Sequence, residues 1–273
     1  MTVYLRPKYS FKVPVNAQCI SPDVFAAKTI EEVKALALWE GNKQRPLGEL
    51  FEINGEDGKA PEEVSIQIIG DVRNVKRIGE GMANGEIAIE GDVGMHLGEK
   101  MKGGKITVSG NADSWLGVMM KGGSITVKGN VGDYVGAAYR GSTKGMHGGT
   151  ITIHGNAGNE AGCYMRKGLI RIFGNAGQFV GMHMRNGTIL VQGDGDERAG
   201  AGMVAGKIVL SGFTNSVLPT FTIDSVKKKV EVDGETVQGP FYLFTGDLAE
   251  KGNGKLYIAQ AKNQHLSFHE KYL

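Results

Sequence analysis

The sequence predicts an all-β protein: a single-stranded, right-handed parallel β-helix solenoid of about seven to eight rungs, with a flanking segment at each end. Three observations support this prediction. A unit of 19 residues recurs along the middle of the chain, β-branched residues occupy two fixed positions of each unit, and glycine accounts for 43 of the 273 residues. That glycine content is roughly twice the usual share of about 7%. A fixed period of this size is typical of repeats that bury one another's apolar faces.

Glycines mark both ends of each unit, which reads Gly-x-x-Met-x-x-Gly-x-Ile-x-Val/Ile-x-Gly. The closing glycines are Gly70, Gly91, Gly110, Gly129, Gly155, Gly174, Gly193 and Gly212. Their spacing is 19 residues apart from a longer first step and one seven-residue insertion, which we expect near Ser142 to His147. Asparagine or aspartate follows most of them, and such turns favour positive φ and side-chain-to-backbone hydrogen bonds. The opening glycines are Gly79, Gly98, Gly117, Gly136, Gly162, Gly181 and Gly200.

Two apolar columns predict one short strand in each repeat. Isoleucine stands four residues before each closing glycine, and isoleucine, valine or leucine stands two before it. The first column is Ile66, Ile87, Ile106, Ile125, Ile151, Ile170, Ile189 and Ile208. Apolar β-branched residues at a spacing of two indicate a half-buried strand. We expect these residues to stack in register, and we predict a second short strand around the apolar residues, such as Ile78 and Leu97, that precede the opening glycines.

Seven of the eleven methionines share one position of the repeat. They are Met82, Met101, Met120, Met146, Met165, Met184 and Met203. A column of flexible thioether side chains is well suited to filling an irregular core. We therefore interpret these methionines, with the repeat glycines, as structural residues and not as metal ligands.

The chain divides into three parts: an N-terminal capping segment (residues 1–63), the repeats (64–212) and a β-rich C-terminal segment (213–273). Thr29 and Glu32 form a capping box, which predicts a helix from Ile30 to about Leu38. Residues 48–53 are predicted to be a strand that enters the first rung. A period of 19 is not a multiple of six, which disfavours a left-handed hexapeptide prism and favours the right-handed form.

The C-terminal segment is predicted to contain a β-hairpin and one further strand. Residues 226–232 and 237–244 are its predicted strands, joined by a turn at Asp233 and Gly234. Residues 256–259 form the further strand. We expect these elements to cap or flank the end of the repeats.

Composition excludes several classes of protein. The formal net charge is +2 with both signs interspersed, which gives no electrostatic basis for binding nucleic acid or membranes. The first residues do not resemble a signal peptide, and no apolar run approaches the roughly 20 residues that span a bilayer. We therefore expect a soluble, cytoplasmic protein. Cys19 and Cys163 are too few for a disulfide scaffold or a zinc site.

No motif predicts a catalytic, cofactor-binding or metal-binding residue in this chain. The six histidines do not share a column in adjacent repeats, and none forms a helical pair with a glutamate between. Asp194 to Glu197 resembles a calcium loop in composition, but the repeat makes it a turn. The columns also supply no carboxylate cluster of the kind a polysaccharide-cleaving solenoid enzyme needs.

One column predicted to point outward is rich in aromatic residues. His96, Trp115, Tyr134 and Phe179 stand five residues after closing glycines, with Glu160 at the same position of the intervening repeat. Stacked in register, they would form an aromatic stripe. We interpret the stripe as a candidate protein interface, since aromatic side chains anchor buried contacts. The alternative is that a terminal segment of the chain folds back over it.

Together the repeat and the segment before it resemble the C subunit of formylmethanofuran dehydrogenase. More broadly the repeat resembles the glycine-repeat C-terminal β-helix domain of glutamate synthase. The residues that carry the more specific resemblance are Ile20 to Phe25, Trp39 to Asn42 and Leu47 to Ile53, together with the repeats and the chain length. The resemblance covers nearly the whole chain.

This resemblance implies a non-catalytic scaffold in a large hetero-oligomeric oxidoreductase complex of archaeal methanogens. In the family, the complex takes electrons from ferredoxin, reduces CO2 and attaches it to methanofuran as N-formylmethanofuran, the first step of methanogenesis from CO2. The expected partners are a molybdopterin or tungstopterin subunit and an amidohydrolase-like subunit. The expected cofactors, molybdenum or tungsten pterin, iron–sulfur clusters and a binuclear metal site, belong to those subunits. Two alternatives are the C subunit of the bacterial formyltransferase/hydrolase complex and a glutamate synthase-like β-helix protein.

Overall fold

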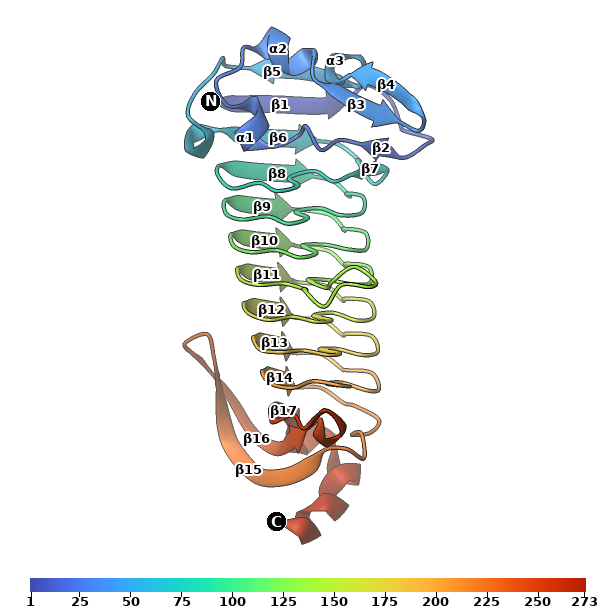
Figure 1. The fold of residues 1–273 in the computed structure, drawn as a ribbon, viewed down its shortest axis with the longest axis vertical. Helices are drawn as coiled ribbons and strands as arrows, with labels where there is room; N and C mark the ends of the chain where they lie inside the picture. The colour runs from blue at the N-terminus through green and yellow to red at the C-terminus, as the bar shows by residue number, and fades with distance from the viewer.

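The computed structural model describes residues 1–273 and is mostly β. Its main feature is one mixed 13-stranded sheet, which forms the long axis of an elongated molecule (Figure 1). The strand order is β15-β16-β17-β14-β13-β12-β11-β10-β9-β8-β6-β1-β5. A second sheet of four strands, in the order β4-β3-β2-β7, lies at the N-terminal end with the short α-helices.

The repeats supply a stack of parallel strands, one strand per repeat. They are β6 (Ser65–Ile69), β8 (Glu86–Glu90), β9 (Lys105–Val108), β10 (Ser124–Val127), β11 (Thr150–Ile153), β12 (Leu169–Ile172), β13 (Thr188–Val191) and β14 (Lys207–Leu210). Their register is the predicted one, because each isoleucine of the first column pairs with the isoleucine of the next repeat. All eight isoleucines are buried. The predicted strand and its in-register stacking are confirmed.

The second strand predicted for each repeat is wrong. The residues that precede the opening glycines are buried but lie in turns. The second place where repeats pair is a set of single-residue parallel bridges, which begins with Val72, Val93 and Ala112. These bridges fall two residues after the closing glycines, inside the turn. A single bridge is enough to align neighbouring turns, and the left-handed conformation at each opening glycine prevents a longer strand.

Hydrogen bonds from side chains align the turns along the stack. The Oδ1 atom of Asn111 accepts from the backbone N–H of Asn130, and the Oδ1 atom of Asn130 accepts from that of Asn156, both at 2.8 Å. The positive φ expected for the closing glycines is wrong from Gly110 onward. A Cβ on Gly129 would instead lie 2.6 Å from the carbonyl oxygen of Gly110. Close approach between repeats therefore explains this glycine column.

The opening glycines and the methionine column fill the interior as expected for core residues. All seven methionines are fully buried. The opening glycines adopt positive φ, 65° at Gly98 for example, and a Cβ there would lie 2.6 Å from the Cδ1 atom of Ile125. The isoleucine and methionine columns therefore belong to one continuous core.

The N-terminal segment extends the stack and closes it. Strand β1 (Thr2–Pro7) pairs parallel with β6 and antiparallel with β5 (Phe51–Gly55). The remaining elements are α1 (Pro22–Phe25), α2 (Ile30–Lys34), α3 (Leu47–Leu50), η1 (Pro61–Glu63), β2 (Val15–Asn16), β3 (Ala37–Glu40), β4 (Lys43–Pro46) and β7 (Val75–Lys76). The capping box at Thr29 is confirmed. The predicted helix is too long, because β3 begins at Ala37 and pairs with β2 and β4.

The predicted strand at residues 48–53 is partly wrong. Its first residues form the helix α3, and only Phe51 onward is a strand. This strand pairs with β1 and not with the first repeat, because β1 already occupies the free edge of β6. Leu47 and Leu50 on α3 are buried, so the helix covers the core at this end.

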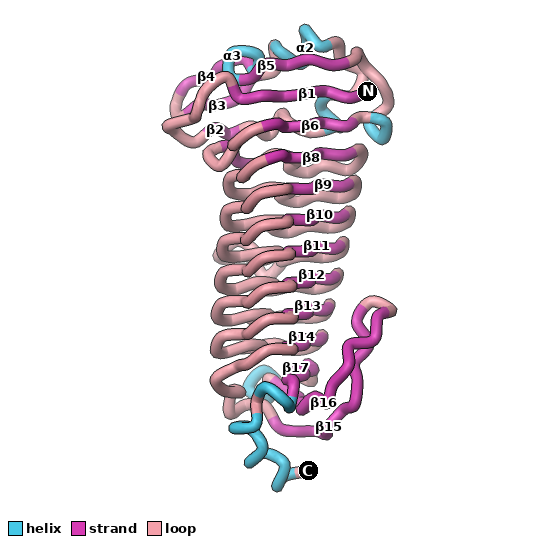
Figure 2. Tube along the Cα trace, turned by 180° about the vertical axis from the view of Figure 1, so that it is seen from behind, coloured by secondary structure: helices cyan, strands magenta, loops and turns pink.

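The C-terminal hairpin is confirmed as β15 (Thr222–Val232) and β16 (Glu235–Gly246), with Asp233 and Gly234 in its turn at φ 51° and 81°. Strand β17 (Gly254–Ala259) continues the parallel stack, since Leu256 pairs with Ile208. Figure 2 shows the hairpin alongside the outer face of the last repeats. Short helices complete the segment: η2 (Leu248–Glu250), η3 (Gln260–Lys262) and η4 (Gln264–Tyr272). None of the helices in the structure has the length and apolar character needed to cross a bilayer.

A small second core explains why the hairpin lies where it does. Leu190 and Val209 occupy outward-facing strand positions where earlier repeats carry threonine, and both are buried against Val230, Val232 and Phe241 of the hairpin. A salt bridge of 3.1 Å between Arg171 and Glu235 lies next to them. The outer part of the hairpin therefore flanks the sheet face, while the base of β16 pairs with β17 beyond the last repeat and places Tyr242 and Phe244 in the main core at this end.

Candidate functional site

The aromatic column lies on an outer corner of the stack, and three of its four residues are in contact. The ring centroids of Trp115 and Tyr134 are 4.2 Å apart, and those of His96 and Trp115 are 6.1 Å apart, with 15° between the planes in both pairs. All three side chains are half-buried. Phe179 lies apart from them because Glu160 takes the intervening position, and it contacts the guanidinium group of Arg198 at 5.2 Å. The structure therefore joins His96, Trp115 and Tyr134 into a stripe that excludes Phe179.

The backbone of this column is left-handed, which the sequence did not indicate. His96, Trp115, Tyr134 and Phe179 have φ between 61° and 67°. This conformation costs roughly 1–2 kcal/mol for a residue with a side chain. Hydrogen bonds to the following repeat stabilise it, since the N–H of Trp115 donates to the carbonyl of Asp133 at 2.8 Å and that of Tyr134 to Asn159 at 2.9 Å. The rings are thus presented from a rigid corner.

The seven-residue insertion covers part of the stripe. It runs from 139 to 145, slightly earlier than predicted, because Met146 takes the methionine position and donates its N–H to Gly136 at 2.9 Å. Its first residue, Tyr139, packs against Trp115 at 5.3 Å and His96 at 5.8 Å between ring centroids. Neither terminus supplies this cover, since both lie at the ends of the stack (Figure 1).

A buried ion cluster adjoins the stripe. The side chain of Glu99 is 0% exposed, and its carboxylate lies 2.8 Å from Arg77, 2.6 Å from Lys100 and 3.5 Å from Nδ1 of His96. The hydroxyl group of Tyr139 lies 3.1 Å from the same His96 nitrogen. The cluster therefore ties the insertion to the repeats on its N-terminal side. In the sequence, the cluster is indicated by Glu99, which stands where the next two repeats carry Val118 and Ala137.

The electrostatics of the cluster favour a charged glutamate and a neutral histidine. Burial raises the pKa of Glu99, but hydrogen bonds from Lys100 and Tyr139 and the charge of Arg77 outweigh it, so the net pKa is lowered. Burial lowers the pKa of His96. Burial and the neighbouring carboxylate of Glu99 raise the pKa of Tyr139, which keeps its hydroxyl group protonated.

We expect acidification to destabilise the fold through this cluster. Stability from His96 is present above its unfolded pKa near 6.5 and is lost as pH falls through its lower folded value. Stability from Glu99 is present above 4.5 and is lost at still lower pH. Urea unfolding at pH 7.5, 5.5, 4.0 and 3.0 follows both steps. Glu99→Gln should cost about 1–3 kcal/mol at pH 7.5 and remove the lower step, whereas an unchanged acid dependence would contradict the assignment.

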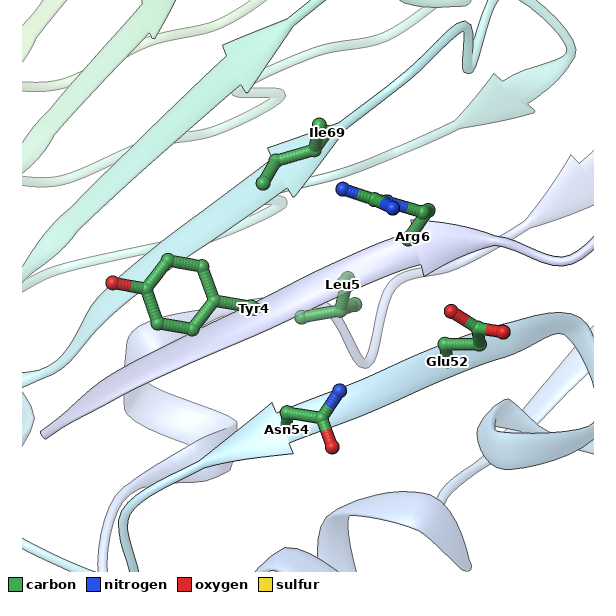
Figure 3. Close-up of a pocket in the computed structure, with 6 residues that line it drawn as sticks. All are labelled: Tyr4, Leu5, Arg6, Glu52, Asn54 and Ile69. Atoms are coloured by element: carbon green, nitrogen blue, oxygen red, sulfur yellow. The ribbon is translucent and has the colours of Figure 1, made fainter.

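A hollow lies on the outer face of β1, β5 and β6, away from the aromatic stripe, and has a volume of about 330 Å³. Figure 3 shows Tyr4 and Arg6 from β1, Glu52 and Asn54 from β5, and Ile69 from β6 around it. These residues include no pair of a nucleophile and a base. The hollow is therefore a weaker candidate than the stripe.

Part of the chain is similar to C subunits of formylmethanofuran dehydrogenases. No family model matches the chain. The C subunit of the tungsten-containing formylmethanofuran dehydrogenase 2 of Methanothermobacter wolfeii is 47% identical over 95 residues, 35% of each chain. The C subunit of the molybdenum-containing formylmethanofuran dehydrogenase 1 of Methanosarcina barkeri is 45% identical over 95 residues, 35% of this chain and 32% of that one. The aligned segments thus span about a third of these curated relatives.

A solved structure extends the similarity to the whole chain. A chain in the crystal structure of the formyltransferase/hydrolase complex from Methylorubrum extorquens, in complex with methylofuran, superposes with a TM-score of 0.83. It is 32% identical, and the match covers 94% of this chain and 99% of that one. The chain belongs to the family of formylmethanofuran dehydrogenase C subunits. The resemblance noted from the repeat and the N-terminal segment is thereby confirmed.

The names of the relatives include tungsten and molybdenum, and this chain has no donor set that fits either metal. Nowhere in the structure do three or more histidine, cysteine, aspartate or glutamate residues lie close enough together to hold a metal ion. Cys163 is buried, and burial together with Glu160 raises the pKa of its thiol to about 12, which disfavours the thiolate that metals require.

Proposed function

We propose that this chain is a non-catalytic structural subunit of a formylmethanofuran dehydrogenase complex. The observation that carries the proposal is the similarity over nearly the whole chain to a chain of the formyltransferase/hydrolase complex. Relatives named as C subunits of formylmethanofuran dehydrogenase support it. The complex would reduce CO2 with electrons from ferredoxin and attach the product to methanofuran as N-formylmethanofuran. This chain would hold the catalytic subunits in place.

The fold suits such a role. We propose that the stack is a right-handed parallel β-helix spanning residues 64–212, capped by residues 1–63 and flanked by residues 213–273. Right-handed connections between parallel strands are strongly preferred, which supports the handedness. A stack whose core, turns and side-chain ladders all repeat in register is stiff, and stiffness is what a spacer between catalytic subunits needs.

The proposed partners are the molybdopterin or tungstopterin subunit and the amidohydrolase-like subunit. The pterin, the iron–sulfur clusters and the binuclear metal site would belong to those subunits, since the donor set of this chain fits none of them. The proposed contact surface on this chain is the stripe of His96, Trp115 and Tyr134. Its support is the cluster of half-buried aromatic rings on a rigid corner.

A second candidate function is favoured by the solved structure, which is a formyltransferase/hydrolase complex. In that case the complex would transfer and hydrolyse formyl groups without reducing CO2. The test is to purify a tagged form of this chain from its native host. Recovery of pterin-bearing subunits with formylmethanofuran oxidation supports the dehydrogenase, recovery of a formyl-hydrolysing complex without redox activity supports the alternative, and recovery of the chain alone contradicts both.

We expect Trp115→Ala to weaken assembly more than folding. Trp115 is half-buried between His96 and Tyr134, so its loss removes a ring from the surface and leaves the interior columns intact. The yield of complex should fall by at least about tenfold, while the unfolding midpoint of the isolated chain moves by only a few degrees. Phe173→Ala, which removes an exposed aromatic ring after β12, is the control and should leave assembly unchanged. Weak folding with intact assembly would mean that the stripe is core.

A further inference from the structure

A cleft opens where the insertion leaves the stack, on the C-terminal side of Tyr139. Its volume is about 390 Å³. Four aromatic side chains line it, namely Trp115, Tyr134, Tyr139 and Tyr164, and Met182 adds a thioether. The cleft exists because the insertion bulges out between the repeat that carries Tyr134 and the repeat that carries Glu160. It lies at the end of the aromatic stripe.

The carboxylate of Glu160 lies in this cleft without a partner of opposite charge. No lysine, arginine or histidine nitrogen is within the 4.0 Å of an ion pair. The buried thiol of Cys163 lies beside it, and the carboxylate helps to raise the pKa of that thiol. The one cation on the rim, Arg140, is exposed and donates to the hydroxyl group of Tyr134 at 3.2 Å, and the charge of Glu160 helps to raise its pKa without an ion pair between them. A half-buried carboxylate among aromatic faces attracts a cation from outside.

We propose that this cleft receives an arginine side chain from another protein of the complex. This inference rests on the proposed function, which supplies the partner. A guanidinium group stacks on aromatic faces and pairs with a carboxylate in two parallel hydrogen bonds, which a lysine ammonium group cannot do. The same column already holds such a contact, since the guanidinium group of Arg198 lies 5.2 Å from the ring centroid of Phe179.

The walls of the cleft are fixed before the partner binds. The Nε and Nη2 atoms of Arg166 donate to the carbonyl of Thr143 at 3.2 and 3.1 Å, and the N–H of Gly145 donates to the carbonyl of Tyr164 at 3.1 Å. On the other side the hydroxyl group of Tyr139 is held by His96. A loop anchored at both ends loses little conformational entropy on binding, which favours a specific contact.

The test measures how fast the chain dissociates from the purified complex as salt concentration rises. Glu160→Gln keeps the shape of the side chain and removes its charge. We expect dissociation at low salt to be at least about tenfold faster than for wild type, with the difference shrinking at high salt. The control is Glu90→Gln, which neutralises an exposed carboxylate at the end of β8 and should dissociate like wild type. Equal rates for Glu160→Gln and wild type would overturn the inference.

Two further measurements identify the occupant. A benzophenone photocrosslinker in place of Tyr164 should join the chain to a partner peptide that contains arginine. A crosslink to a peptide without arginine, or to a second copy of this chain, would overturn the inference. Arg140→Gln should leave dissociation unchanged or slow it, whereas acceleration equal to that of Glu160→Gln would mean that Glu160 serves only to hold Arg140. If the wild-type chain does not copurify with other subunits, the proposed function itself is wrong, and the inference is overturned with it.

Discussion

Ile125→Asp is expected to leave the chain unfolded at room temperature. Ile125 is fully buried on β10 and stacks between Ile106 and Ile151 in the isoleucine column. The substitution removes a large apolar side chain and places a carboxylate in an interior that offers it no partner. The two effects together cost roughly 5 kcal/mol or more, which is comparable to the whole stability of a typical domain. Circular dichroism and thermal unfolding measure the result.

The next residue on the same strand provides the control. Thr126 points to the outer face of the sheet and is partly exposed. Thr126→Asp introduces the same charge at the opposite face, and we expect a change in the free energy of unfolding within about 1 kcal/mol. A cooperative transition for Ile125→Asp at the wild-type midpoint would show that this column is not the core of the stack.

The period of the repeat and the register of its strands were predictable because every repeat shows the same pattern of residues. The isoleucine column identified the strand and its pairing, since a register shift of one residue would turn that column outward. The second predicted strand failed at residues such as Ile78 and Leu97. These residues are buried as expected, but the left-handed glycine that follows each of them turns the chain. Burial alone does not distinguish a strand from a turn that packs inward.

The secondary structure at the ends of the stack was less predictable, because each of these segments occurs once and has no repeated pattern to identify its strands. Leu47 and Leu50 are three residues apart, which places both on one face of a helical turn but on opposite faces of a strand, and both are buried on the helix α3. Strand β17 continues the stack although the hairpin separates it from β14 by more than 40 residues. The position of the hairpin was indicated by Leu190 and Val209, because these residues are apolar at outward positions where earlier repeats carry threonine.

The candidate site was predictable only in part. The column position identified the aromatic residues and the stacking of Trp115 on Tyr134. The return of Tyr139 across that stripe was not predictable, because an insertion has no register of its own. The burial of Glu99 follows from the same contact, since Tyr139 and Arg77 enclose its carboxylate.

Gly155→Ala is expected to destabilise the stack by about 3 kcal/mol. A Cβ at this closing glycine would lie 2.5 Å from Oδ1 of Asn130 and 2.6 Å from the carbonyl oxygen of Gly129. Neither atom can move freely, because the N–H of Gly155 donates to that carbonyl and Oδ1 of Asn130 accepts from Asn156 at 2.8 Å. Overpacking costs about 1–3 kcal/mol, and the loss of the ladder hydrogen bond adds about 1 kcal/mol. Urea unfolding measures the sum.

Gly141→Ala separates this close approach from the general effect of replacing a glycine. Gly141 lies in the insertion at φ 84°, and a Cβ there would meet no atom within 4 Å. Its replacement should therefore cost only the left-handed strain of about 1 kcal/mol. Gly155 has no such φ, so any excess over Gly141→Ala measures the contact between repeats. Equal costs for the two variants would mean that the repeats can separate locally, and the closing glycines would then need another explanation.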